Sequence, residues 1–296
     1  MLLIPEIFNI SRCSLDDGPG VRTVVYFKGC NMRCKWCHNP ESHSASPEIS
    51  YAKQKCVGCG RCAEICPDCH QMLGGEHIFK REKCIGCGKC ADICVAKSLT
   101  VVGEKTSPSD LLARVMKDED YFKATGGGVT LSGGECLLYP EFAAEFLKLC
   151  AERGINALVE SAFNVDAENI EKVMPYVDEF YVDLKLFDSE KHKEFTGVGN
   201  EKIKENILKF ANEKMTIRIP LIPGVNDDDE NLSASVQFAK KAGVKAVQLL
   251  KYNYLYASKY ELSGKSASLF AQETQSDEYM EKLCEKLDEN GYVFFR

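Results

Sequence analysis

Three cysteines with the spacing C-x3-C-x2-C lie near the start of the chain, at Cys30, Cys34 and Cys37. A cubane [4Fe–4S] cluster normally takes four cysteine ligands, so three thiolates leave one of its irons without a protein ligand. An open coordination position distinguishes a catalytic metal site from a structural one. The spacing therefore predicts an iron–sulfur cluster that binds a substrate or cofactor directly, in addition to carrying electrons.

Two longer cysteine runs follow between residues 56 and 94. Each has the spacing C-x2-C-x2-C-x3-C of bacterial ferredoxins, in which the fourth cysteine of one run ligates the cluster of the other run. We therefore expect two more [4Fe–4S] clusters, held by Cys56, Cys59, Cys62 and Cys94 and by Cys84, Cys87, Cys90 and Cys66. Two matched runs disfavour zinc, the first rival for paired cysteines. Cys69 lies close enough to Cys66 to be an alternative ligand.

The composition is that of an ordinary globular protein apart from its sixteen cysteines. Of 296 residues, 45% are hydrophobic and 27% are charged, and the net charge of −7 argues against a nucleic-acid partner. The sequence contains no apolar run of about 18 residues for a membrane helix, and its start lacks the basic and apolar regions of a signal peptide. We therefore expect a cytoplasmic protein whose cysteines bind metal instead of forming disulfides.

The rest of the chain alternates between strand and helix patterns. Strands are expected at 21–27, 128–131, 155–159, 180–184, 215–222 and 244–250, and helices at 141–153, 166–174, 202–212 and 227–242. About six strand–helix units predict an α/β fold built as a partial parallel (βα)6 barrel. The cysteine-rich segment, residues 50–102, interrupts this pattern after the first unit. We expect it to be a ferredoxin-like two-cluster insert in a domain formed by residues 1–49 and 103–296.

Polar and glycine residues stand at the carboxyl ends of these strands, where parallel barrels concentrate their chemistry. The three-cysteine motif follows the first strand. The later strand ends carry Gly133, Gly134, Glu135, Glu160, Asp183, Lys185, Arg218 and Asn253. Arg218 sits between Ile217 and Ile219, where a charge is costly unless it is paired. We expect these residues, with Trp36 and His38 next to the motif, to surround one ligand, such as an amino-carboxylate that chelates the open iron.

The motif and its flanks resemble those of a known family. Asp17-Gly18-Pro19-Gly20-Val21-Arg22 leads through Phe27-Lys28-Gly29 into C-x3-C-x2-C, and His38-Asn39-Pro40 follows. This combination resembles the signature of the glycyl-radical enzyme activating enzymes, members of the radical S-adenosylmethionine (radical SAM) superfamily. The resemblance covers residues 7–260 and includes the ferredoxin-like insert that many members carry.

The resemblance implies a barrel of the radical SAM type and a specific activity. S-adenosylmethionine would chelate the open iron of the cluster on the three cysteines, and one electron would cleave it to methionine and a 5′-deoxyadenosyl radical. That radical would abstract a hydrogen atom from a glycine in the C-terminal loop of a partner glycyl-radical enzyme. A one-electron donor such as flavodoxin or ferredoxin would supply the electron, and the radical chemistry implies an anaerobic setting.

The resemblance also implies roles for individual residues. Cys30, Cys34, Cys37 and Lys185 would be catalytic. Gly133, Gly134 and Glu135 match the motif for the methionyl amine, and Asp183, Leu184 and Lys185 match a segment beside the cofactor and the peptide substrate. Arg218 matches an arginine near the cofactor, and Glu160 matches an acidic residue that helps to hold a monovalent cation.

Two positions depart from the family pattern, and two other functions compete with it. Cys136 replaces a common proline, and Asn253 replaces a histidine; asparagine can hydrogen-bond a ribose hydroxyl but cannot titrate near neutral pH.

A radical SAM enzyme for a small molecule needs a closed pocket, whereas an activating enzyme needs an opening for a peptide loop. A ferredoxin-type electron carrier leaves the three-ligand motif without an explanation. The sequence names neither the partner enzyme nor the role of the insert, which is electron relay or docking.

Overall fold

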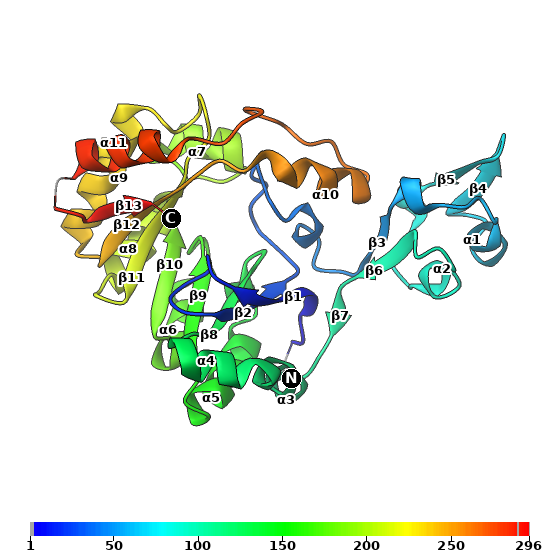
Figure 1. Cartoon of the computed structure of the whole chain (residues 1–296), viewed down its shortest axis with the longest axis horizontal. Coiled ribbons are helices and arrows are strands. Elements are labelled where there is room, and N and C mark those ends of the chain that lie inside the picture. Colours follow the sequence, from blue (N-terminus) through cyan, green and yellow to red (C-terminus); the bar gives the residue numbers. More distant parts are fainter. Residues whose placement is uncertain (1–2, 289, 296) are drawn as a thin grey trace.

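The computed structural model describes residues 3–288 and 290–295 of the chain. Within these residues a nine-stranded sheet forms the centre, in the order β13-β12-β11-β10-β9-β8-β2-β1-β7 (Figure 1). Its strands are β1 (Glu6–Ser14), β2 (Arg22–Phe27), β7 (Glu104–Lys105), β8 (Gly128–Gly133), β9 (Asn156–Ser161), β10 (Glu179–Asp183), β11 (Met215–Pro220), β12 (Ala246–Leu250) and β13 (Val293–Phe295). The seven described strands from β2 to β13 pair in parallel, whereas β1 pairs antiparallel with both β2 and β7.

The α/β class with a mostly parallel sheet is the one that the strand–helix pattern predicts. All six predicted strands are present, as β2 and β8 to β12. The sheet is larger than expected, because β1 and β7 extend one edge and β13 adds a parallel strand at the other. Among the described residues β7 and β13 do not pair with each other, so the sheet stays open.

Helices cover one face of this sheet (Figure 1). They are α3 (Pro108–Val115), α4 (Glu119–Thr125), α5 (Pro140–Glu152), α6 (Ala167–Val173), α8 (Glu201–Phe210), α9 (Asp229–Ala242) and α11 (Asp277–Leu287). Two further helices lie elsewhere: the end of α7 (Ser189–Thr196) contacts the loop after β2, and α10 (Ala257–Leu262) contributes to a separate cluster around Trp36. Local signals set their ends: Asp228 accepts a hydrogen bond from the Asn231 N–H at the start of α9, and Gly243, with φ of 80°, ends it. No helix in the described parts of the chain is long and apolar enough to cross a membrane.

The opposite face of the sheet is polar and forms the wall of a pocket. Ile217 and Ile219 of β11 lie in the core, and Arg218 between them faces the pocket, since successive strand residues alternate. The same alternation turns Glu160 of β9 and Asp183 of β10 toward the pocket. Parallel pairing brings Asp183 level with Arg218. Sheet geometry therefore gathers charges from three neighbouring strands.

The cysteine-rich segment extends away from the sheet (Figure 1). At its base β3 (Glu48–Tyr51) pairs antiparallel with β6 (Leu99–Val102), and beyond them lie helices α1 (Arg61–Ile65) and α2 (Lys89–Asp92) and a hairpin of β4 (His70–Leu73) and β5 (Glu76–Phe79). The Arg81 guanidinium donates to Ile49 O at 2.6 Å and to Leu262 O at 2.7 Å, which joins the segment to α10. The β3–β6 ribbon bounds the segment close to residues 50 and 102, and its standing as a separate domain stays a prediction.

Candidate active site

The three-cysteine motif lies on the loop that leaves β2, and its side chains line a pocket at the carboxyl ends of the strands. The Arg33 N–H donates to Thr196 O at 2.7 Å, which holds this loop against the end of α7. The pocket brings together most of the predicted site residues: Cys30, Cys34, Trp36, Cys37, His38, Gly133, Gly134, Glu135, Glu160, Asp183, Lys185 and Arg218. Leu184 and Asn253 are not among the residues that line it.

Burial controls the protonation of the three cysteines. It raises the pKa of Cys30 and Cys34 to about 12 and that of Cys37 to about 11, while the Lys185 ammonium acts in the opposite direction on all three. Such thiols become thiolates near neutral pH only when a metal replaces their protons. Three sulfurs that line one pocket and form no disulfide are a suitable donor set for a [4Fe–4S] cluster with one open iron.

Gly133 and Gly134 allow the end of β8 to approach the cysteine loop. Gly133 has φ of 110°, in the left-handed region that favours glycine. A Cβ on Gly134 would lie 2.2 Å from Gly29 O and 3.2 Å from the Cys30 Cβ, so a side chain does not fit there. The Glu135 N–H donates to the same Gly29 O at 2.8 Å. Backbone therefore forms the part of the pocket wall next to Cys30.

The Glu135 carboxylate is buried and already accepts hydrogen bonds within the protein. Its donors are the Ser161 hydroxyl at 2.8 Å, the Ala162 N–H at 3.0 Å and the Leu137 N–H at 3.2 Å. Burial raises the pKa of Glu135 to about 7. The Ser161 oxygen also accepts from the N–H of Phe163, a non-glycine residue with φ of 55°. Glu135 thus holds the loop after β9, which contains one strained residue, at the edge of the pocket.

Asp183 and Lys185 face the pocket from the end of β10. The Lys185 ammonium donates to the Asp183 carboxylate at 2.6 Å. Burial by itself lowers the pKa of Lys185, but the Asp183 carboxylate, and Cys34 when it is a thiolate, raise it above its usual value, so the ammonium is retained. Leu184 is the predicted cofactor-binding residue of this strand whose side chain does not face the pocket, and a contact through its backbone stays a prediction. Its side chain is fully buried in the core, because strand alternation turns it away from the pocket.

Arg218 forms an ion pair with Glu160 across β10. The guanidinium donates to one carboxylate oxygen, and the Ser132 hydroxyl donates to the other at 2.6 Å. The two side chains are only 12% and 16% exposed. Burial opposes the Arg218 charge, but Glu160 raises the pKa of Arg218 above its usual value. The buried Arg218 Nε has no hydrogen-bond partner among the described residues, so a polar atom of a bound ligand would satisfy it.

Trp36 and His38 add aromatic surface to the pocket. Trp36 is buried against Phe195 and Phe270. His38 stacks on Tyr256 with ring centroids 5.1 Å apart. His38 keeps an exposed edge, but desolvation by the packed protein around it and the nearby Lys259 ammonium lower its pKa to about 4, so its imidazole is neutral near pH 7 and offers one donor and one acceptor.

The position of Asn253 differs from the prediction. Its side chain is exposed and accepts a hydrogen bond from the Leu255 N–H at 2.9 Å, at the start of the 3-10 helix η7 (Tyr254–Tyr256). Asn253 is thus committed to capping a turn, and Lys251 and Tyr252, just before it, line the pocket instead. Nothing in the spacing of this segment indicates which of its side chains turns inward.

Comparisons with known proteins identify the family. The model of the radical SAM superfamily matches residues 24–235. An indoleacetate decarboxylase activating enzyme from Tractidigestivibacter scatoligenes is 37% identical over 96% of this chain and 95% of its own length. A trans-4-hydroxy-L-proline dehydratase activating enzyme from Clostridioides difficile is 40% identical over 94% of each chain. This chain belongs to the radical SAM activating enzymes of glycyl-radical enzymes.

As a radical SAM activating enzyme, the chain binds a [4Fe–4S] cluster and S-adenosylmethionine, and it acts on a glycyl-radical enzyme. When bound, such a cluster would supply the one-electron reduction that cleaves S-adenosylmethionine, the radical chemistry by which these enzymes take a hydrogen atom from the partner's glycine. A solved structure of Streptococcus suis SuiB bound to precursor peptide SuiA has a TM-score of 0.56 at 12% identity, over 92% of this chain and 48% of that one. It shows a shared fold alone.

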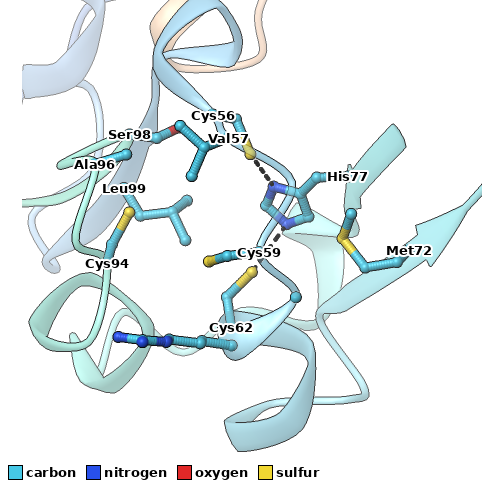
Figure 2. Close-up of a pocket in the computed structure, with 12 residues that line it drawn as sticks. Cys56, Val57, Cys59, Cys62, Met72, His77, Cys94, Ala96, Ser98 and Leu99 are labelled. Carbon is cyan, nitrogen blue, oxygen red and sulfur yellow. Dashed lines mark hydrogen bonds between the residues drawn. The ribbon is translucent and has the colours of Figure 1, made fainter. Parts of the chain in front are cut away.

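The insert of this activating enzyme gathers its cysteines in two groups. In the first group Cys94 joins Cys56, Cys59 and Cys62 (Figure 2). The second group contains Cys66, Cys69, Cys84, Cys87 and Cys90. These groups correspond to the crossed ferredoxin pattern, with Cys69 as a fifth sulfur in the second group. Burial raises the pKa of Cys69 to about 12. Cluster ligation by either group stays a prediction.

Sequence reasoning placed Arg22 in a functional signature, but the structure places it at the amino ends of the strands, away from the pocket. Its fully buried guanidinium donates to the Thr130 hydroxyl at 2.6 Å and to the Asn156 carboxamide oxygen at 2.9 Å. Arg22 therefore joins β2, β8 and β9, which is a contribution to stability. Sequence reasoning also missed His70 and His77 of the insert, which no motif or spacing marks.

Proposed function

We propose that this activating enzyme uses three [4Fe–4S] clusters, one on Cys30, Cys34 and Cys37 and two in the insert, to form the glycyl radical of its partner. The observation that carries the proposal is that three half-buried thiols share one pocket with Lys185 and Arg218. A cluster with an open iron and an amino-carboxylate ligand needs this combination of sulfur donors and fixed positive charges.

In this proposal the pocket residues bind and orient S-adenosylmethionine. Arg218, whose buried Nε lacks a partner among the described residues, would donate to an oxygen of the ligand. Lys185, held by Asp183, would keep a positive charge beside Cys34. The backbone of Gly133 and Gly134 would border the methionyl amine. Glu135 would position the neighbouring loop, because its oxygens already accept hydrogen bonds from protein groups.

The insert would pass electrons to the catalytic cluster from a one-electron donor of the flavodoxin or ferredoxin type. It contains eight Lys and Arg residues against five Asp and Glu between positions 50 and 102, although the whole chain has a net charge of −7. This small excess of positive side chains would partly offset the negative charge of two thiolate-ligated clusters. The cytoplasmic location and the standing of this segment as a two-cluster domain are parts of the same proposal.

At Glu160, the Arg218 guanidinium already supplies the positive charge that the predicted monovalent cation would bring.

Iron analysis and cofactor cleavage test this proposal. After anaerobic reconstitution we expect about twelve iron atoms per chain. Cys34→Ala should lose about four of them and form no 5′-deoxyadenosine from S-adenosylmethionine with dithionite. Cys13→Ala is the matched control, since Cys13 is exposed on β1 and lies in none of the three cysteine sites. Retained cleavage in Cys34→Ala would remove the catalytic assignment, and about four irons in the wild type would remove the insert clusters.

The rival function is a radical SAM enzyme that acts on a small molecule. The two functions differ in which molecule carries the radical at the end of the reaction. Incubation with a glycyl-radical enzyme of the kinds that the relatives activate, such as a dehydratase or a decarboxylase, should produce a glycyl-radical EPR signal on that enzyme. Cleavage of S-adenosylmethionine that a small molecule stimulates, with no radical on any such enzyme, would favour the rival.

A further inference from the structure

The imidazole of His77 lies between two sulfurs of the first insert group, as Figure 2 shows. Its Nδ1 is 3.8 Å from the Cys56 Sγ, and its Nε2 is 3.5 Å from the Cys62 Sγ. The ring is buried and comes from β5, where Met72 of β4 is its cross-strand partner. A polar ring at this position acts directly on whatever these two sulfurs bind.

A second buried histidine orients this ring. The His70 Nδ1 is 2.9 Å from the His77 Nε2, and the His70 ring stacks on Phe79. A neutral imidazole carries one N–H and leaves its other nitrogen as an acceptor, so two neutral rings in contact share one donated proton. The buried His70 Nε2 has no partner among the described residues, whereas Nδ1 has one. The His70 proton is therefore best placed on Nδ1, where it is donated to the His77 Nε2.

This arrangement leaves the proton of His77 on Nδ1, which faces Cys56. We propose that the His77 Nδ1–H donates a hydrogen bond to the Cys56 sulfur and makes the cluster on Cys56, Cys59, Cys62 and Cys94 easier to reduce. A donor to an anionic sulfur stabilises the reduced, more negative cluster more than the oxidised one. His77 is then a positioning residue that is not itself a ligand, and His70 selects its tautomer. The inference rests on the insert clusters of the proposed function.

An EPR-monitored redox titration of the fully reconstituted chain tests the inference. His77→Phe removes the N–H, and we expect one insert cluster to become about tenfold harder to reduce, or about 59 mV for a one-electron couple. His77→Gln retains an N–H donor and should restore most of the shift. His70→Phe should give a smaller shift in the same direction, because the His77 proton is no longer held on Nδ1. Met72→Leu, which changes the cross-strand partner and removes no donor, should leave the potential unchanged.

The outcomes separate this inference from the proposed function. An unchanged potential in a fully loaded His77→Phe chain overturns the inference. Loss of about four irons from both His77→Phe and His77→Gln also overturns it, because the ring would then be a ligand. Zinc that is bound by the wild type and lost in His77→Gln would assign Cys62, His70 and His77 to a zinc site instead. A wild-type chain with about four irons would show that the insert clusters themselves are absent.

Discussion

Replacing Gly134 with alanine tests how closely the end of β8 must approach the cysteine loop. The new Cβ would lie 2.2 Å from Gly29 O, whereas ordinary contact begins at 3.4 Å, so the two backbones must separate by about 1.2 Å. Gly29 O cannot retreat without cost, because it accepts the Glu135 N–H at 2.8 Å. The displacement therefore falls on the backbone that lies next to Cys30.

A misplacement of about 1 Å near a reacting centre can cost about 100-fold in rate. We therefore expect Gly134→Ala to slow the dithionite-driven cleavage of S-adenosylmethionine by about that factor, measured as 5′-deoxyadenosine formed per chain. The crowding itself should lower the free energy of unfolding by about 1–3 kcal/mol. Iron content, measured on the same sample, separates a displaced pocket wall from a lost cluster.

Gly154→Ala is the matched control for this variant. Gly154 has φ of 68°, and a Cβ there would meet nothing within 4 Å. The substitution strains the backbone by about 1–2 kcal/mol and leaves the pocket untouched. We expect it to lower stability and to retain the wild-type cleavage rate. Wild-type cleavage together with wild-type cofactor affinity in Gly134→Ala would refute the close-approach reasoning.

Other perturbations test groups away from this glycine. Arg218→Met leaves the buried Glu160 carboxylate without its cation. We expect it to lower the free energy of unfolding, measured by urea titration, by about 3–5 kcal/mol. A loss well under about 1 kcal/mol would contradict a buried ion pair. Burial lowers the pKa of His192 below its ordinary value of about 6.5. The unfolded chain therefore binds the extra proton first, and stability is lost as the pH falls below that value. His192→Gln should reduce the drop in the urea midpoint between about pH 7 and about pH 5, and equal drops in both proteins would refute this sign. Arg81→Ala removes the hydrogen bonds to Ile49 O and Leu262 O. We expect the backbone amides of α10 to exchange with deuterium faster in this variant. Unchanged exchange would mean that the β3–β6 ribbon alone holds the insert.

The central strands could be predicted because each is a short apolar run between helical patterns. The edge strands could not. β1 (Glu6–Ser14) carries polar residues along most of its length, and β13 spans only Val293–Phe295. Such segments become strands because a neighbouring strand offers hydrogen-bonding partners, and a local pattern does not record that.

The same limit applies to the two predicted site residues that do not line the pocket. Leu184 stands between Asp183 and Lys185, and the two-residue period of a strand could have indicated that it faces the core. Asn253 lies in the segment after β12, where no such period exists, and it became a turn cap. Sequence position at a strand end therefore indicates proximity to the pocket, but not the direction of each side chain.

The sequence by itself determined the chemistry available to this protein: the number and spacing of its thiols, and the charged residues at its strand ends. These features depend on residue type and short-range spacing, which a sequence contains completely. Only the tertiary structure decided which distant groups meet. Glu160 pairs with Arg218, 58 residues away, and the His77 ring lies against Cys56 and Cys62. Such pairings depend on strand register and on the burial of charge, and these arise only when the whole chain is packed.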